Sequence, residues 1–219
     1  MSRTKKIVAG SATAAVIATT TAFLPNWEGM DTVAKKDMIG TGHPITYCYG
    51  QTDEFGKVKE GTRFTKQECD EKLAGSLPAY LERLDKCIKV PLPVKAVSAI
   101  LDASYNAGTA AVCKSPMLAK MNSGDILGGC NAFRGWYVRS AGQVRKGLIA
   151  RRSGIDARKS ERDLCLEGLK EPKVTWYDGF QAEVMTPPVV AEKRKAEEKK
   201  IAEAKSWKRY FRWIWKDHS

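Results

Sequence analysis

The stretch WEGMDTVAKKDMIGTGHPITYCYGQT, residues 27–52, holds the two acidic side chains on which an enzymatic interpretation depends. Glu28 precedes a glycine, Asp37 follows nine positions later, and a Thr- and Tyr-rich segment with strand character comes next. Cleavage of a glycosidic bond needs one carboxyl group that donates a proton and a second that handles water or the sugar cation. The spacing alone is weak evidence, because most charged side chains are simply exposed. The rest of the chain decides.

Length and charge set the broad class. A chain of 219 residues can hold one good domain plus appendages. Its net charge of +12 indicates an anionic partner, which is a nucleic acid, a membrane surface or an acidic polymer such as a bacterial wall. The charge does not choose among these three.

Cysteine usage points to an oxidising compartment. With only two histidines and no CxxC pair, a zinc site is not expected. Three disulfides in an exported protein fit an even, widely spread set better than the alternative of buried reduced thiols in the cytosol. The six cysteines are Cys48, Cys69, Cys87, Cys113, Cys130 and Cys165.

The first 25 residues differ from the rest. Residues 7–25 carry no charge and follow Arg3, Lys5 and Lys6. Nineteen such residues are just enough to span a bilayer, and the basic flank predicts a cytoplasmic N-terminus with the remainder exported. The segment is rich in Ala, Gly, Ser and Thr, so it gains little from lipid and is able to leave it. A signal peptide cleaved after Ala22, with Thr20 two positions before, is the alternative.

The body, residues 26–170, reads as mostly helical with one small hairpin region at 45–64, an α+β pattern. Thr65 and Glu68 form a capping box before a helix that reaches about Lys86. Proline suits the first turn of a second helix near Pro93, which stops at Asn-Ala-Gly, residues 106–108. Shorter helices are expected at 115–122 and 125–134, and a longer one at 155–168. Apolar faces run along the two main helices, at Cys69, Leu73, Leu77, Leu81 and Leu84 and at Val94, Val97, Ile100, Leu101 and Tyr105.

The composition changes after residue 170. Residues 171–190 carry three prolines and read as a linker, and residues 191–205 are expected to form a charged Ala/Glu/Lys helix without an apolar face. Residues 206–219, SWKRYFRWIWKDHS, combine interfacial aromatics with basic charge, which is typical of a helix on an anionic membrane or envelope surface. Packing of this face on the main domain or on a second copy is the alternative.

Several strings of the body, in order, resemble the phage-type lysozymes of glycoside hydrolase family 24, the muramidase endolysins. The resemblance covers roughly residues 26–168, about two thirds of the chain. Each string is weak alone, and their order is the stronger signal. They are EG at 28–29 with Asp37 at the family's eight-residue gap, TYCYGQT at 46–52, FTKQEC at 64–69, SYNAG at 104–108, CNAFRGW at 130–136, GLIARR at 147–152 and ERDLC at 161–165.

The resemblance implies a lysozyme-like fold and hydrolysis of the β-1,4 bond between N-acetylmuramic acid and N-acetylglucosamine in peptidoglycan, with no cofactor or metal. Glu28 would be the general acid, which requires that an apolar neighbourhood keep it protonated near neutral pH. Asp37 would stay ionised, and Thr46 would hold the attacking water of an inverting reaction. Tyr105 and Asn106 are the expected substrate-binding residues.

Two departures from the family pattern stand out. The family places its catalytic threonine six positions after the aspartate, where this chain has His43, so Thr46 takes the role only if residues 42–44 are a loop insertion. His43 remains the local substitute. Residues 153–156, SGID, lengthen the segment before Glu161, which bears on packing more than on chemistry.

The first segment narrows the resemblance to signal-anchor-release endolysins, which are held inactive in the host inner membrane, facing the periplasm, and become active after release. One of the 15 ways of pairing six cysteines ties the hairpin to its following helix and clamps the helical lobe, as Cys48–Cys69, Cys87–Cys113 and Cys130–Cys165. No cysteine lies in residues 1–47, so no thiol switch is expected from the anchor. A non-catalytic, membrane-tethered envelope-binding protein is the alternative. A nucleic-acid partner is not expected, because export and disulfides count against it.

Overall fold

The computed structural model describes residues 3–38, 43–137, 139–140, 143–144, 146–155, 157–171, 173–176 and 184–185. The chain divides into two compact units, residues 1–183 and residues 184–219. Only strand β7 (Val184–Met185) is described in the second unit. The predicted charged helix at 191–205 and the aromatic tail at 206–219 lie outside the described residues, as does most of the predicted linker.

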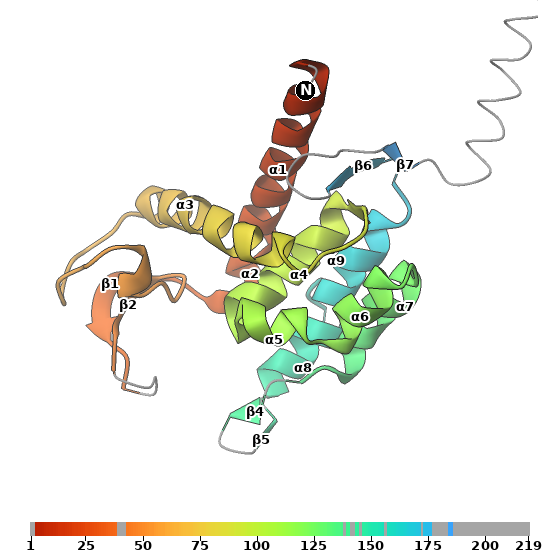
Figure 1. Ribbon diagram of the computed structural model, residues 1–219. Coiled ribbons are helices and arrows are strands. Elements are labelled where there is room, and N and C mark those ends of the chain that lie inside the picture. Colours follow the sequence, from red (N-terminus) through yellow and green to blue (C-terminus); the bar gives the residue numbers. More distant parts are fainter. Residues whose placement is uncertain are drawn as a thin grey trace, which may run out of the picture. The chain divides into compact units, whose positions relative to one another are not determined.

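The uncharged N-terminal segment forms helix α1 (Arg3–Phe23), drawn in red in Figure 1. Buried side chains recur every three or four residues at Ala12, Val16, Thr20 and Phe23, so one face of α1 contacts the domain. The helix packs against α3 (Lys66–Asp85) and α4 (Val94–Ala107). Ser98 of α4 donates a hydrogen bond to the Val16 carbonyl over 3.3 Å. Within the described part of the chain, no helix has the length and apolar character needed to cross a membrane.

A four-residue helix, α2 (Pro25–Glu28), continues from α1 after a turn at Leu24. Pro25 occupies its first position, where the missing N–H costs nothing. Gly29 ends it with φ 64°, a left-handed conformation that residues with a side chain adopt only at a cost. This requirement explains the glycine that follows Glu28.

The chain then enters a two-stranded antiparallel hairpin of β1 (Asp31–Lys36) and β2 (Ile45–Cys48), with Lys35 opposite Thr46. The expected hairpin region at 45–64 was wrong in one respect, because the partner strand of β2 precedes it. Strand β1 was not predicted because most residues of its DTVAKK sequence are exposed, so the sequence shows no alternation of apolar and polar residues. Residues 61–64 do join the sheet by hydrogen bonds to β1, as Ala34 N–H donates to the Thr62 carbonyl over 2.8 Å. A one-turn 3-10 helix, η1 (Asp53–Phe55), lies in the chain between β2 and residues 61–64.

Helix α3 connects the hairpin to the helical lobe (Figure 1). The predicted capping box is confirmed, since Thr65 accepts from the Glu68 N–H and the Glu68 carboxylate accepts from the Thr65 N–H over 2.7 Å. The predicted face is buried at all five apolar positions from Cys69 to Leu84. Helix α4 begins just after Pro93 and ends before Gly108, which has φ 84°, so its predicted limits are also confirmed.

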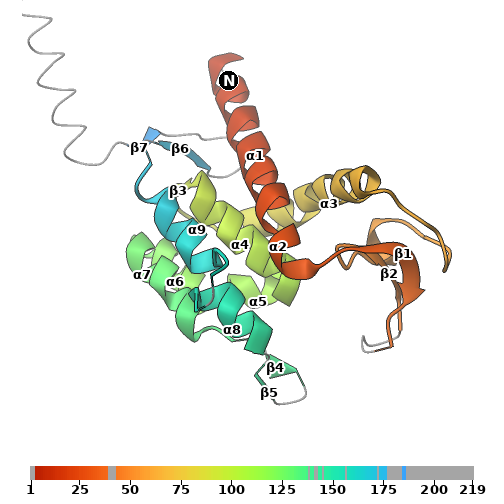
Figure 2. The same cartoon turned by 180° about the vertical axis from the view of Figure 1, so that it is seen from behind.

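The helical lobe surrounds α4, most of whose residues are buried. Its further helices are α5 (Thr109–Cys113), α6 (Pro116–Asn122), α7 (Ile126–Ala132), η2 (Phe133–Gly135), α8 (Lys146–Ser153) and α9 (Glu161–Gly168). Figure 2 shows α9 beside α4, with α8 below it. Two short antiparallel pairs complete the first unit, β3 (Leu92–Pro93) with β6 (Lys173–Trp176) and β4 (Arg139–Ser140) with β5 (Gln143–Val144).

The expected helix at 155–168 was wrong at its start. Helix α9 begins only at Glu161, because Ser160 caps it and forms a second capping box with Asp163. Gly154, with φ 70°, lies just beyond α8, the helix not anticipated from the sequence. Residues 157–160 therefore form a non-helical connection between two helices.

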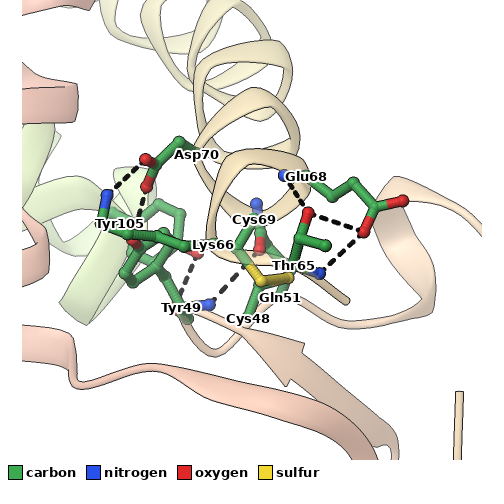
Figure 3. The surroundings of a disulfide bond; sticks show 9 residues. All are labelled: Cys48, Tyr49, Gln51, Thr65, Lys66, Glu68, Cys69, Asp70 and Tyr105. Atoms are coloured by element: carbon green, nitrogen blue, oxygen red, sulfur yellow. Dashed lines mark hydrogen bonds and ion pairs between the residues drawn. A yellow bond between two sulfur atoms is a disulfide. The ribbon is translucent and has the colours of Figure 1, made fainter. Parts of the chain in front are cut away.

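All three predicted disulfides are present and none of the cysteines is free. Cys48–Cys69 joins the hairpin to α3, as Figure 3 shows. Cys87–Cys113 and Cys130–Cys165 close loops within the helical lobe. Each bond removes conformational freedom from the unfolded chain and so stabilises the folded state.

Candidate active site

Glu28 lies at the C-terminal end of α2, where the helical lobe meets the hairpin strand β1. Its side chain is 20% exposed. The Arg151 guanidinium donates a hydrogen bond through Nη1 to Glu28 Oε1 over 2.5 Å. A carboxyl group that is reachable from solvent and fixed by a buried cation has a defined direction, which proton transfer to a bound substrate requires.

Arg151 is in turn fixed by Asp102 from the centre of α4. Its Nε and Nη2 groups donate to the two Asp102 oxygens, each over 2.8 Å. This two-pronged geometry is the strongest that a guanidinium makes with a carboxylate. Both side chains are almost completely buried, at 3% and 0% exposure. Burial lowers the pKa of Arg151, but the carboxylates of Asp102 and Glu28 raise it further, so the net direction is upward and Arg151 stays charged.

A second buried ion pair supports the first. Glu161, at the start of α9, has no exposure and accepts a hydrogen bond from Arg152, while Arg151 Nε lies 3.4 Å from the same oxygen. Burial is the largest influence on Glu161 and raises its pKa. Three carboxyl groups (Glu28, Asp102 and Glu161) thus face two guanidinium groups. Removing either cation would leave buried negative charge without compensation.

Arg152 links this cluster to the predicted substrate-binding residue Asn106. Its Nη2 group donates to Asn106 Oδ1 over 2.9 Å, and its guanidinium lies 5.0 Å from the centre of the Trp136 ring. The hydrogen bond from Arg152 to the amide oxygen therefore fixes the orientation of the Asn106 side chain. Asn106 still reaches the pocket at Glu28.

That pocket has a volume of about 260 Å³. Glu28 and two arginines line it, so it combines one acid with two cations. Its walls are Trp27, Glu28, Asn106, Gly147, Leu148, Arg151 and Arg158. The predicted residues Glu28 and Asn106 are thus brought together.

Asp37, His43 and Thr46 lie on the hairpin and are not among the residues that line this pocket. Asp37 directly follows β1, and its N–H donates to the Pro44 carbonyl over 2.8 Å. The His43 ring Nδ1 is 3.0 Å from the Asp37 carbonyl oxygen. Thr46 belongs to β2 and donates to the Lys35 carbonyl over 3.4 Å. All three residues thus belong to the hairpin, and the choice between His43 and Thr46 stays a prediction.

Tyr105, the other predicted substrate-binding residue, bridges the two regions. Its hydroxyl donates to the Tyr49 carbonyl over 2.8 Å, and its ring centre is 5.4 Å from that of Tyr80. Burial and then the nearby charge of Glu28 raise the pKa of Tyr105. Tyr49 itself donates to Asp70 over 2.5 Å (Figure 3). Burial, and then the hydrogen bond to Asp70, raise the pKa of Tyr49 to about 12. The Tyr105 hydroxyl thus joins α4 to the hairpin.

Comparison with known proteins decides the family. The model of the family described as phage lysozyme matches residues 25–154, more than half of the chain. The chain belongs to the phage lysozyme family. It is therefore a lysozyme, an enzyme of the muramidase class.

Similar proteins agree with this assignment. The lysozyme is 33% identical over 64% of its length to a SAR-endolysin of bacteriophage PS119 and to one of enterobacteria phage P21, covering 77% and 78% of those chains. Among solved structures it resembles the endolysin of Escherichia coli O157:H7 phage FAHEc1, with 26% identity, a TM-score of 0.57, and coverage of 68% and 90% of the two chains. A P22 lysozyme variant, with 24% identity and a TM-score of 0.56 over 68% and 95% of the chains, shows the same fold.

The lysozyme site includes residues that sequence reasoning missed. Asp102, Arg151 and Glu161 were not singled out, although two signals were present. Asp102 is the single acidic residue between Val94 and Ala107, and an aspartate is rarely buried unless it is paired. The adjacent arginines at 151–152 stand in one of the family-like strings.

Proposed function

We propose that this lysozyme is a phage endolysin that hydrolyses the β-1,4 bond between N-acetylmuramic acid and N-acetylglucosamine and so lyses the host cell. The observation that carries the proposal is Glu28, held by Arg151 at a pocket inside the segment that matches the family. The similar proteins of phages PS119 and P21 are both named SAR-endolysins, which supports a role in lysis of the host cell.

In the proposed reaction Glu28 protonates the leaving oxygen of the scissile bond. Its Oε1 atom is engaged by Arg151, so the second carboxyl oxygen is the natural proton donor. Asp37 stays ionised and aligns the attacking water or stabilises the positive charge on the sugar, and Thr46 helps to hold that water. An inverting reaction requires the two carboxyl groups about 6.5–9.5 Å apart in the substrate complex.

The N-terminal helix fits a second part of the proposal, that residues 7–25 hold the enzyme in the inner membrane before release to the periplasm. The names of the relatives support this, as does the small-residue composition of α1. The described conformation, with Val16 and Thr20 buried on the domain, would then be the released one. Mass spectrometry of the mature protein distinguishes an intact anchor from a signal peptide cleaved after Ala22.

The positive charge supports a partner of opposite sign, and peptidoglycan carries carboxylates. The net charge of +12 favours association with such a polymer. Residues 206–219 are proposed to contact anionic membrane or envelope surfaces. Deleting them should leave activity on purified peptidoglycan unchanged and reduce attack on whole cells, and equal performance on both substrates would remove this role.

The Glu28→Gln variant tests the catalytic assignment. It keeps shape and one hydrogen-bond acceptor for Arg151, but its amide has no acidic proton to give. We expect loss of at least 100-fold in reducing-sugar release from purified peptidoglycan, because general acid catalysis contributes about 10²–10⁴ in rate. Glu82→Gln, an exposed change of equal charge on α3, is the matched control.

Mass spectrometry of the released sugars identifies which bond is cut. Glu28→Gln with parental activity would contradict the assignment. An inactive parent protein that still binds cell walls would instead favour the alternative, a membrane-tethered envelope-binding protein.

A further inference from the structure

Helix α2 carries Glu28 with little support of its own. It has four residues, and none of them is buried. Helices this short are unstable in isolation, because too few hydrogen bonds offset the cost of ordering the backbone. Gly29, which follows directly, adds freedom on the other side. Arg151 fixes the end of the Glu28 side chain, but something else must fix its backbone.

The connection at residues 157–160, called the strap here, makes contact at this point. The Arg158 guanidinium carbon lies 3.9 Å from the centre of the Trp27 ring, and Arg158 Nη1 donates to the Asn26 carbonyl over 3.4 Å. The Trp27 indole Nε1–H donates to the Lys159 carbonyl over 3.1 Å. All three contacts fall on the two residues before Glu28.

The strap is itself held firmly. Ser160 caps α9, and its hydroxyl donates to Asp163 over 2.7 Å. Lys159 Nζ donates to Glu167 over 2.6 Å, and the same Glu167 oxygen lies 3.1 Å from Lys95 of α4. The strap therefore connects α2 to helices α4 and α9 of the lobe.

We infer that Arg158, acting through Trp27, is a positioning residue that sets the direction of the Glu28 side chain. Arg151 fixes the carboxyl end and the strap fixes the backbone end, so the acid is held at two points. The inference rests on the proposed role of Glu28. Arg158 lines the same pocket, and the test therefore separates positioning from direct contact with substrate.

The experiment compares initial rates of reducing-sugar release over a range of peptidoglycan concentrations. For Arg158→Ala we expect kcat to fall about 10-fold or more with KM changed less than about twofold, because a misplacement near 1 Å costs up to about 100-fold in rate. Arg158→Lys keeps a cation over the indole and should recover part of the loss. Arg63→Ala, an equal change of charge at an exposed side chain outside the helical lobe, should match the parent.

A second measurement does not depend on activity. The Trp27 indole N–H signal, assigned by its absence in Trp27→Phe, should exchange faster with solvent in Arg158→Ala than in the parent. Trp27→Phe keeps an aromatic ring for Arg158 to contact but loses the hydrogen bond to Lys159, so its kcat should lie between those of Arg158→Ala and the parent. This variant also serves if Arg158→Ala fails to fold.

Three outcomes would overturn the inference. The first is a kcat for Arg158→Ala within twofold of the parent. The second is a raised KM with unchanged kcat, which marks direct substrate contact. The third is an equal loss of kcat in the control Arg63→Ala. Failure of the proposed function looks different, because Glu28→Gln would then stay active whatever Arg158→Ala does. Unchanged indole exchange in Arg158→Ala would also refute the strap contact, independently of catalysis.

Discussion

Asp102→Asn tests the idea that the site is built on a buried ion pair. The change leaves the side-chain volume almost unaltered, so no cavity forms. The new amide NH₂, however, faces an N–H group of Arg151, and two donors cannot form a hydrogen bond with each other. One of the two bonds of 2.8 Å is lost, and Arg151 at 3% exposure has no access to water that would replace it. Breaking a buried pair by removing one partner costs about 3–5 kcal/mol. Because one acceptor oxygen remains, we expect the lower end, about 3 kcal/mol.

Urea unfolding with the disulfides intact measures this cost. With a urea slope of about 2 kcal/mol/M, the midpoint should fall by about 1.5 M. Ser104→Ala is the matched control, because Ser104 lies on the same helix, is fully buried, and bonds only to the Ile100 carbonyl of its own helix in the contacts described. That change should cost about 1 kcal/mol or less.

Activity gives a second reading of the same variant. Arg151 would lose one of its hydrogen bonds to residue 102 and would fix the Glu28 carboxylate less precisely. We therefore expect kcat to fall about 10-fold at temperatures where the protein remains folded. If Asp102→Asn costs no more than Ser104→Ala and leaves kcat unchanged, the buried pair neither stabilises the fold nor orients the acid.

Three further outcomes are expected. Replacing both Cys130 and Cys165 by serine opens a loop with a sequence separation of 35 residues and should lower the free energy of unfolding by about 4 kcal/mol, measured by urea titration of the oxidised proteins. Thr65→Ala removes one half of a capping box and should cost about 1 kcal/mol, and a cost near zero would show that the Glu68 side chain alone suffices. Burial raises the pKa of Glu161 above its ordinary 4.5, so the stability it contributes is present below that value and lost as pH rises through the folded pKa. The stability of Glu161→Gln relative to the parent should therefore improve from pH 4.5 upward, and a drift in the other direction would contradict this sign.

Local signals in the sequence predicted the parts of the fold that local interactions determine. The Thr65–Glu68 box and the stop at Gly108 depend on residues within one turn, and both were placed correctly. The disulfide partners, 21 to 35 residues apart, were one choice among 15 possible pairings, and local signals did not determine it. Family-like strings placed Glu28 at a helix end before a glycine.

Long-range contacts explain what was missed. Asp102 and Arg151 are 49 residues apart, and nothing near either one predicts their pairing. The expected helix from residue 155 does not include residues 157–160, because Ser160 caps a helix that begins at Glu161 and the Lys159 carbonyl accepts a hydrogen bond from Trp27, 132 residues away. Strand β1 was overlooked because its exposed charged side chains hide the alternation that marks a half-buried strand.

The positions of the cross-links divide the enzyme into two mechanical parts. The disulfides close three separate loops, residues 48–69, 87–113 and 130–165. Helix α1, Glu28 and strand β1 all precede Cys48 and lie outside these loops. Only noncovalent contacts therefore hold this N-terminal part of the chain against the helical lobe. Reduction of the disulfides would open the three loops but would break no contact that Glu28 itself makes.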